Sequence, residues 1–457
     1  LQVSALVRRN ERIHQPAYAI LDTVRARNKF IASLPFTLTR AQEGVIAEIA
    51  YDLTQTRPMN RLLQGDVGSG KSVVALIAAH SALQANYTVV YLAPTEILAR
   101  QQAKYFMEVF GSEQVALLIG ASKSHEKQQI KERLASNEAL CVVGTHALLQ
   151  DDVQLHRCAL AIIDEQHRFG VAQRKALQLA VKNEPVPHLL SMTATPIPRT
   201  LSLTVYGDLD VSVLDELPPG RQPVSTTIVA PRGREEVIMH VLEELHRGRQ
   251  AYVIAPLVEA SEKLEVKSAK ETAVEMQRLF PDIAVGLLHG QLPSEEKDQV
   301  LRAFAAGALQ LLVSTSVVEV GVNVPNATIM MIEGAERFGL AQLHQFRGRI
   351  GRGSEQSYCY LFPSQGALAT NRLHILTQTT DGFVIAEKDL ELRGPGEVYG
   401  VAQSGFGNLQ VASLLDYDMI KLARTEAEQL LTKDPELEKY PIIRKKVAQK
   451  NLETHFE

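Results

Sequence analysis

The eight residues GDVGSGKS, from Gly65 to Ser72, constrain the fold of this chain more than any other stretch. They follow the apolar pair Leu62-Leu63 and lead directly into the helix-forming segment VVALIAAHSALQA. A strand, a glycine-rich turn and a helix start in this order match the phosphate-loop signature, whose backbone N–H groups bind phosphate at a helix N-terminus. The sequence therefore predicts a nucleotide site formed by Gly65, Asp66, Val67, Gly68, Ser69, Gly70, Lys71 and Ser72.

Two side chains of this loop have specific expected roles. Lys71 is long enough to reach the β- and γ-phosphates as a point charge, and the hydroxyl of Ser72 is in the position that ligates Mg²⁺. The alternative is a glycine-rich turn that contains Lys-Ser by chance. The strand before the loop and the helix after it favour nucleotide binding instead.

Apolar runs alternate with helix-forming segments along most of the chain. The run from Tyr87 to Pro94 is continuous, as in a strand buried on both faces, and similar runs follow at 140–149 and 158–163. A stretch rich in proline and glycine at 210–224 indicates a boundary, after which a second alternation begins without a phosphate loop. The pattern predicts an α/β fold with two doubly wound parallel sheets.

The composition is that of a globular protein without an overall basic field. The 457 residues are 45% hydrophobic and 22% charged, and the formal net charge is -4. This length predicts two or three domains, and a nucleic acid would have to bind through local patches, backbone amides or another region. Cys141, Cys158 and Cys359 lie in separate apolar runs, so we interpret them as small buried residues of a reducing compartment rather than as metal ligands.

Further features of the sequence concern the compartment of the protein and the first residues of the chain. No apolar run approaches the ~20 residues that span a bilayer, and no signal-like leader is found, so we expect a cytoplasmic protein without a membrane partner. The first residue is Leu1 rather than Met, which favours the C-terminal part of a longer chain. Residues 1–34 are expected to form a linker helix, whose arginines are either solvated or in contact with phosphates.

Two adjacent carboxylates follow an apolar run in the first half of the chain. Asp164 and Glu165 come directly after residues 159–163, so they are expected at the sheet edge beside the phosphate loop. Neighbouring residues that leave a strand point to different sides. Asp164 is thus expected to hold Mg²⁺, mostly through water, and Glu165 to polarise the water that attacks the γ-phosphate. The alternative is a charged pair that caps the next helix.

Two other segments contain polar side chains suited to the same site. Gln42 precedes the phosphate loop by about one helix, and its amide can present a donor and an acceptor to an adenine edge. Thr193 and Thr195 lie at the end of a later strand. Their hydroxyls are expected to bond to the carboxylate loop and to a partner domain, as in a sensor of nucleotide state.

The second half of the chain contains a basic, glycine-punctuated segment, GLAQLHQFRGRIGRG. Arg349 and Arg352 are three residues apart, which would place them on one face of a helix. Guanidinium groups stabilise the charge that develops on a γ-phosphate. The alternative, a solvated basic surface, is disfavoured by the glycines, which permit close backbone approach. We expect the second domain to close over nucleotide held by the first.

Seven motifs occur in the order that is typical of the superfamily-two helicases and translocases, which have paired RecA-like domains. They are GDVGSGKS, APTEILARQ, VGTHAL, DEQH, MTATPIPRTL, STSVVEVGVNVP and QFRGRIGR. Within that superfamily the chain resembles the RecG family, through LPFTLTRAQ, DEQHRFGV and the tail DGFVIAEKDLELRGPGEVYGVAQSGF. The resemblance covers nearly all of residues 30–415. It implies two tandem RecA-like domains plus a C-terminal helical hairpin or tail.

The resemblance also implies a role for each matching residue. Gln42 would contact adenine, and the catalytic residues would be Lys71, Asp164, Glu165, Gln345, Arg349 and Arg352, with ATP and Mg²⁺ as cofactors. Contact with the nucleic acid, or coupling to it, is implied for Pro94, Thr95, Arg100, Thr145, His146, Thr193, Thr195, Arg393, Gly396, Glu397 and Gln403. Asn323 stands where relatives commonly have Asp, which leaves a ribose contact there open.

The family implies substrates and partners as well. The motor would remodel branched double-stranded DNA, namely stalled forks and Holliday junctions, in recombination and repair. It would act as a monomer at the bacterial nucleoid, with single-strand-binding protein as a further partner, and a junction-gripping wedge domain would precede Leu1. Two alternatives stay open: the motor of an Mfd-like transcription-repair coupling factor, and a nucleotide-gated switch that binds nucleic acid without translocation.

The expected division of the chain has four parts. A linker helix and adenine-side segment (1–54) precede a first RecA-like domain (55–215) and a second one (216–380). A translocation hairpin with a helical tail (381–457) ends the chain.

Overall fold

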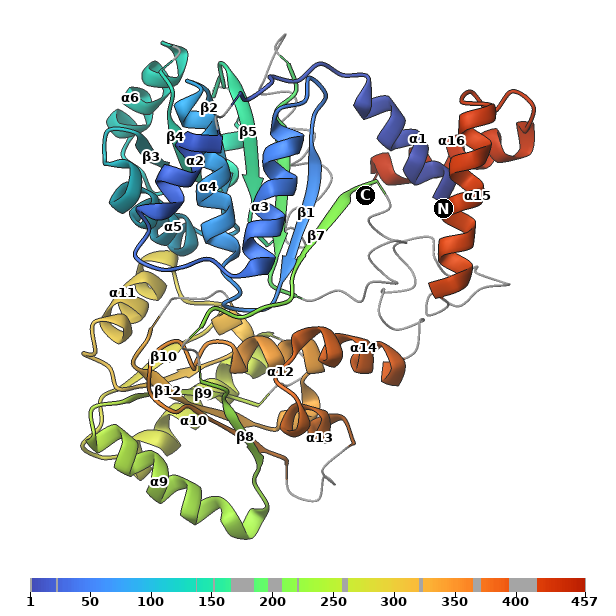
Figure 1. Cartoon of the computed structure of the whole chain (residues 1–457). Coiled ribbons are helices and arrows are strands. Elements are labelled where there is room, and N and C mark those ends of the chain that lie inside the picture. Colours follow the sequence, from blue (N-terminus) through green and yellow to red (C-terminus); the bar gives the residue numbers. More distant parts are fainter. Residues whose placement is uncertain are drawn as a thin grey trace. The chain divides into compact units, whose positions relative to one another are not determined.

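The computed structural model describes most of the chain (Figure 1). The described residues are 2–21, 24–136, 138–150, 153–165, 185–195, 208–219, 222–256, 262–319, 324–364, 371–393 and 417–456. Contacts within the chain divide it into two compact units. The first unit contains Leu1–Gly65, Ser69–Glu216 and Pro395–Glu457, and the second contains Asp66–Gly68 and Leu217–Gly394.

A seven-stranded sheet forms the centre of the first unit. Its order is β3-β4-β2-β5-β6-β1-β7, and all neighbours are parallel. Every residue of β2, β4 and β5 is buried, which explains their continuous apolar runs. The strands are β1 (Asn60–Gly65), β2 (Thr88–Leu92), β3 (Val115–Leu118), β4 (Cys141–Gly144), β5 (Cys158–Ile163), β6 (His188–Thr193) and β7 (Asp210–Leu214).

Among the described residues, five helices pack on this sheet or on one another. They are α2 (Val24–Ala32), α3 (Arg40–Leu53), α4 (Lys71–Gln84), α5 (Glu96–Phe110) and α6 (Ser124–Ala135). A capping box starts α3, because Thr39 and Gln42 each accept a hydrogen bond from the other's backbone N–H. Helix α4 contacts α2, α3 and three strands, so it is buried along most of its length.

The second unit is built around a six-stranded parallel sheet. Its order is β10-β11-β9-β12-β13-β8. The strands are β8 (Ser225–Ile228), β9 (Gln250–Ile254), β10 (Val285–Leu288), β11 (Leu311–Ser314), β12 (Ala327–Glu333) and β13 (Tyr358–Phe362). The helices are α9 (Arg234–His246), α10 (Glu262–Leu279), α11 (Ser294–Ala305), α12 (Leu340–Arg347), α13 (Asn371–Gln378) and α14 (Gly382–Arg393).

The two sheets share one strand order. If β1 to β6 are replaced by β8 to β13, the order of the first sheet becomes that of the second, and β7 is the additional edge strand of the first sheet. This confirms the predicted fold class of two tandem doubly wound α/β domains with a helical C-terminal region.

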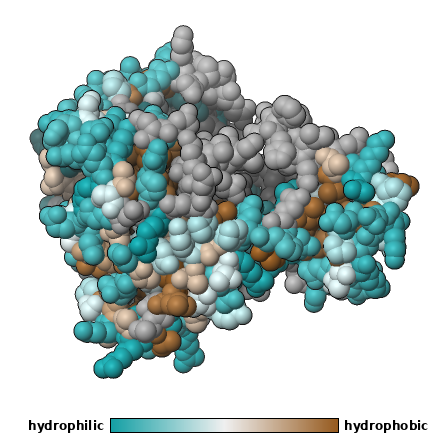
Figure 2. All heavy atoms as spheres, turned by 90° about the horizontal axis from the view of Figure 1, so that it is seen from above, coloured by the Kyte–Doolittle hydropathy of each residue, from teal (hydrophilic) through white to brown (hydrophobic). Residues whose placement is uncertain are grey.

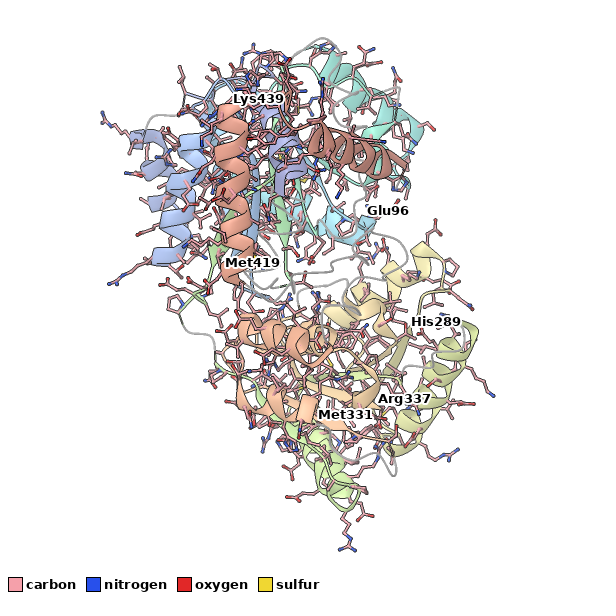
Figure 3. All side chains as sticks on the ribbon, turned by 90° about the vertical axis from the view of Figure 1, so that its right-hand side faces the viewer. Glu96, His289, Met331, Arg337, Met419 and Lys439 are labelled. Atoms are coloured by element: carbon pink, nitrogen blue, oxygen red, sulfur yellow. The ribbon has the colours of Figure 1, made fainter. Side chains whose placement is uncertain are left out.

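The two ends of the chain meet in a helical group of the first unit (Figure 1). Helix α1 (Gln2–Ile13) packs on α15 (Tyr417–Lys433) and α16 (Pro441–Phe456). Leu6 of α1 shares an apolar cluster with Leu431 and Val447. Met419 lies near the start of α15, and Lys439 lies in the connection between α15 and α16 (Figure 3). The residues expected to form the N-terminal linker and the C-terminal tail are therefore packed as one group.

One sequence expectation about the elements was wrong, a second needs refinement, and one strand was missed. Residues 1–34 do not form one helix: α1 ends at Ile13, Pro16 interrupts the helical backbone, and Ile20 N–H donates to Leu53 O instead. The boundary expected at 210–224 agrees with the change of unit between Glu216 and Leu217, although its first residues form strand β7, which pairs with β1. Strand β13, which pairs with β12 and β8, was not predicted.

The surface and the cysteines agree with the composition. Among the coloured residues of Figure 2, hydrophilic ones predominate. Cys141, Cys158 and Cys359 are free and buried, as expected, and burial raises the pKa of the Cys141 thiol to about 12. Within the described part of the chain, no helix is long and apolar enough to cross a bilayer.

Candidate nucleotide site

The phosphate loop leaves the end of β1 and enters α4. Lys71 is the first residue of α4, and its Nζ donates to Gly65 O at 2.8 Å. Gly70 has a φ of +87°, and a Cβ there would lie 2.2 Å from Gln42 Nε2, so a larger residue does not fit. Asp66, Val67 and Gly68, the middle of the loop, are grouped with the second unit.

Gln42 bridges the start of α3 and the phosphate loop. Its Nε2 donates to Ser69 O at 2.8 Å, and its Oε1 accepts from Thr39 N–H at 3.0 Å. An amide has a second N–H and a second lone pair. An adenine contact by Gln42 therefore stays a prediction, and it would use these remaining groups.

The two carboxylates at the end of β5 have different partners. Asp164 Oδ2 accepts from the hydroxyl of Tyr91 at 3.1 Å, and Asp164 Oδ1 accepts from Glu165 N–H at 3.0 Å. Glu165 Oε2 accepts from Ala194 N–H at 3.2 Å, and Glu165 has a φ of +51°. The two side chains are thus held by different elements, as the sequence predicted from their adjacent positions.

Charge is concentrated at Asp164. Burial raises the pKa of Asp164 to about 6, the neighbouring Glu165 adds to this, and Lys71 is the main opposing influence. Burial, followed by Asp164, also raises the pKa of Tyr91 well above its usual value, so the Tyr91 hydroxyl stays protonated and donates. A partly buried carboxylate and a cation at a phosphate loop are the groups that a metal-bound nucleotide requires.

The strand end at Thr193 contacts the carboxylate loop in a different way from the one expected. The Oγ1 atoms of Thr193 and Thr195 lie 2.7 Å apart, so the two hydroxyls bond to each other. The bond to Glu165 comes from the backbone N–H of Ala194. This strand end is therefore connected to the expected catalytic carboxylate, but through the backbone rather than through a hydroxyl.

The residues expected to touch nucleic acid in the first unit lie in two strand-to-helix connections. Pro94 and Thr95 link β2 to α5, and Thr95 Oγ1 accepts from Leu98 N–H at 3.4 Å as the N-cap of α5. Arg100 of α5 lines an open groove of about 1130 Å³ that β3 and α6 complete. After β4, Thr145 is buried and His146 is exposed.

A carboxylate from the start of α5 contacts a loop residue, Ala121, that lines this groove. Glu96, labelled at the start of α5 in Figure 3, accepts from Ala121 N–H at 3.1 Å through Oε1. This contact fixes the loop between β3 and α6.

Arg349 and Arg352 of the second unit do not lie on a helix, which corrects the expectation that they share a helical face. Helix α12 ends at Arg347, and Gly348 is its C-cap. Arg352 Nε donates back to Gly348 O at 3.2 Å. Burial raises the pKa of the Tyr252 hydroxyl in β9 to about 12, and the positive charges of Arg352 and Arg349 oppose this rise. The segment after α12, rather than one face of a helix, therefore carries the two charges that influence Tyr252 of β9.

Two neighbours of these arginines are buried in α12. Gln345 is 9% exposed. Arg347, which is 3% exposed, donates to Leu376 O and Thr379 O at 2.7 and 2.9 Å. Arg347 therefore anchors the end of α13, which is a structural role.

Some expected residues lie outside the described residues. These are Gln166 and His167 of the DEQH motif, Asn323, Gly396, Glu397 and Gln403. Arg393 is the last residue of α14.

Sequence reasoning missed three groups at this site. They are the Tyr91 hydroxyl, the side-chain amide of Gln102 on α5 and the backbone N–H of Ala194. Tyr91 is the only residue with a hydroxyl in the run 89–93. The polar atom in an otherwise apolar strand was a usable signal for Tyr91, because a buried hydroxyl needs a partner.

Three family models match consecutive parts of the chain. The DEAD/DEAH box helicase model matches residues 39–204, and the helicase conserved C-terminal domain matches residues 233–354. The model for ATP-dependent DNA helicase RecG, domain 3, C-terminal, matches residues 379–453.

Curated relatives match nearly the whole chain. The ATP-dependent DNA helicase RecG of Synechocystis sp. is 48% identical over 456 residues, which are 98% of this chain and 54% of that protein. The protein of the same name from Bacillus subtilis is 49% identical over 415 residues, 89% of this chain and 60% of that protein. The chain therefore spans somewhat more than half the length of these relatives.

Solved structures give the same result. A structure of RecG bound to a three-way DNA junction superimposes with a TM-score of 0.79 and 42% identity, over 94% of this chain and 55% of that one. The helicase MrfA bound to DNA has a TM-score of 0.59 at 16% identity, over 89% of this chain and 62% of that one, which shows a shared fold.

Proposed function

Because the chain belongs to the RecG family of superfamily-two helicases, we propose that it is an ATP-driven motor that translocates on double-stranded DNA and remodels branches. Forks and Holliday junctions are the proposed substrates, in recombination and repair. The DNA junction in the related RecG structure supports this choice. The observation that carries the proposal is the partly buried Asp164 at the end of β5, which is held by the Tyr91 hydroxyl at 3.1 Å and whose charge is opposed by Lys71 of the phosphate loop.

The chain's own groups have distinct proposed roles in hydrolysis. Lys71 binds the β- and γ-phosphates, and backbone N–H groups from Gly65 to Ser72 surround them. Glu165, held by Ala194 N–H at 3.2 Å, orients the attacking water. In this role the contact with Ala194 links the water-activating group to the strand end at Thr193 and Thr195.

Magnesium fits the donors that the first unit offers. Ser72 Oγ and the Asp164 carboxylate are the hard oxygen ligands that Mg²⁺ prefers, and the buried amide oxygen of Gln102 has no partner among the described residues. Ser72 and Asp164 would hold the ion, Asp164 mostly through water. The ion would neutralise charge on the phosphates.

The second unit is proposed to supply the remaining groups. Arg349 and Arg352 would stabilise the charge of the transition state, with Gln345 beside them. Their charges reach Tyr252 together, which supports a common role. The proposed division is 1–54, 55–215, 216–380 and 381–457, with the last part coupling hydrolysis to movement.

DNA contacts and partners complete the proposal. Pro94, Thr95, Arg100, Thr145 and His146 would contact the phosphate backbone without reading sequence. The chain would act as a monomer in the bacterial cytoplasm, at the nucleoid and with single-strand-binding protein. The bacterial relatives support this setting.

A hydrolysis assay tests the proposal. The rate of ATP hydrolysis is measured without DNA and with forks, four-way junctions or plain duplexes of equal length. We expect stimulation by DNA, largest for the branched forms. A chain that binds ATP and DNA without any stimulated hydrolysis would be a nucleotide-gated switch instead.

Arg393 tests the coupling role of the last part. Arg393→Ala is expected to keep most DNA-stimulated hydrolysis and to abolish fork unwinding. An equal loss of both activities would contradict the coupling role.

A further inference from the structure

Tyr91 places a hydroxyl inside the otherwise apolar strand β2. The residue is 0% exposed, and its ring packs edge-on against Phe106 of α5 with 5.4 Å between the centroids. Its hydroxyl donates to Asp164 Oδ2 at 3.1 Å. A buried hydroxyl is costly unless it is bonded, so this hydrogen bond defines the orientation of both side chains.

Gln102 makes a similar contact from α5. The side chain is 8% exposed, and its Nε2 lies 3.4 Å from Ser72 Oγ, to which it donates. Its Oε1 is buried and has no partner among the described residues. The amide is therefore fixed at one end by Ser72 and has a free acceptor at the other.

The two contacts share an origin and a target. Tyr91 and Gln102 come from consecutive elements, β2 and α5, and each bonds to one of the two proposed magnesium ligands. Metal ligands are oriented by the groups that hydrogen-bond to them, and the loss of such a group weakens metal binding. A carboxylate oxygen that is held by Tyr91 leaves the other oxygen and its remaining lone pairs for water or metal.

We propose that Tyr91 and Gln102 are positioning residues for the magnesium site, Tyr91 through Asp164 and Gln102 through Ser72. The inference rests on the proposed function, since it assumes that these two ligands hold Mg²⁺ with bound nucleotide. It adds that β2 and α5, which are joined by Pro94 and Thr95, determine the affinity of the site for Mg²⁺.

The experiment measures magnesium affinity apart from hydrolysis. Binding of a fluorescent ADP analogue is titrated in EDTA and then at rising free Mg²⁺, for wild type, Tyr91→Phe and Gln102→Met. Both substitutions keep the side-chain volume and remove the hydrogen bond. Tyr105→Phe is the matched control, because Tyr105 lies on α5 with its ring 6.1 Å from that of Phe106.

We expect Tyr91→Phe to raise the Mg²⁺ concentration at half-saturation about tenfold. Gln102→Met is expected to raise it about threefold, because a neutral hydrogen bond is weaker than one to a charged group. ADP affinity in EDTA should stay within about twofold of wild type, and Tyr105→Phe should match wild type throughout.

The possible outcomes distinguish a failure of this inference from a failure of the proposed function. Unchanged half-saturation in both variants, with a normal Mg²⁺ response in wild type, would overturn this inference and leave the proposed function intact. Equal losses of ADP affinity with and without Mg²⁺ would also overturn it, since they indicate a general packing defect. A wild-type chain whose nucleotide binding ignores Mg²⁺ would contradict the proposed function itself.

Discussion

The two sheets have the same strand order but differ at the positions where the first sheet carries its charges. In the first unit, β5 is followed by Asp164 and Glu165, and Glu165 has a φ of +51°. In the second unit, β12 occupies the same place between β9 and β13, and it ends in Glu333 followed by Gly334, with a φ of +61°. The same turn thus presents two carboxylates in one unit and one in the other.

The basic residues at the corresponding helix starts also differ between the two units. Lys71 begins the helix after β1, and Arg234 begins the helix after β8. Arg234 forms a two-point ion pair with Glu333, at 2.7 and 3.0 Å, and its guanidinium lies 4.7 Å from the ring centroid of Phe362. The carboxylate and the cation of the second sheet therefore neutralise each other. One architecture thus carries the proposed nucleotide site in the first unit and an ion pair in the second.

The two units do not differ at every loop that follows a strand. Lys127 Nζ donates to Gly120 O at 2.7 Å in the loop before α6, and Lys297 Nζ donates to Gly290 O at 2.5 Å in the loop before α11. His289, labelled in Figure 3, precedes this second glycine. Both loops follow the edge strands β3 and β10. The edge loops are thus shared, whereas the central strand ends have diverged.

The largest expected effect comes from the cation of the first unit. Lys71→Ala should reduce DNA-stimulated ATP hydrolysis to background, because the phosphates lose their point charge. The rate is measured at saturating ATP and DNA. Arg234→Met, at the corresponding helix start, is the matched control and should keep nucleotide binding. An undiminished rate in Lys71→Ala would remove the basis of the comparison.

The arginines after α12 come next. Arg349→Ala and Arg352→Ala should each lower the hydrolysis rate by about 10³-fold, as expected for guanidiniums that stabilise a phosphoryl-transfer transition state. ATP affinity should change only a few-fold. Single-turnover rates and equilibrium binding separate the two quantities, and a loss confined to affinity would contradict the catalytic role.

A smaller loss is expected at the water-activating carboxylate. Glu165→Gln keeps an oxygen that can accept from Ala194 N–H but removes the base, so hydrolysis should fall about 10²-fold with ADP affinity unchanged. Pre-steady-state hydrolysis measures the chemical step directly. A wild-type rate in this variant would assign the activation of water to another group.

The smallest effect concerns the ion pair of the second unit. Arg234→Met should destabilise that unit by about 1–2 kcal/mol, because it leaves Glu333 without its partner. Hydrogen exchange of the β12 amides reports this change locally. Lys267→Ala, which removes an exposed pair with Glu271, is the control and should have almost no effect. Equal exchange rates in the two variants would argue against a structural role for Arg234.

The sequence was sufficient for the fold class and for the position of the two carboxylates at the end of β5. Continuous apolar runs predicted the buried parallel strands, and charges directly after such runs predicted the sheet edge, because strand ends in this fold converge there. The position of Asp164 and the helix start at Lys71 followed from this pattern alone.

The sequence could indicate that the Tyr91 hydroxyl needs a partner, but it could not indicate which partner a neutral group has. The bonds from Tyr91 to Asp164 and from Ala194 to Glu165 depend on which way a side chain or an N–H points, and spacing does not determine that direction. The end of α12 at Arg347 was missed because a helical spacing continued through Gly348. The packing of α1 on α15 joins residues from both ends of the chain, which local patterns do not connect.

The central claim is that Arg349 and Arg352 act on the nucleotide bound at Lys71. The most direct test is the affinity for ADP with aluminium fluoride, which mimics the transition state, compared with ADP alone. Wild type should bind the mimic at least about 10²-fold more tightly. The Arg349→Ala/Arg352→Ala double variant should bind ADP normally and lose this gain. A gain that persists in the double variant would contradict the account.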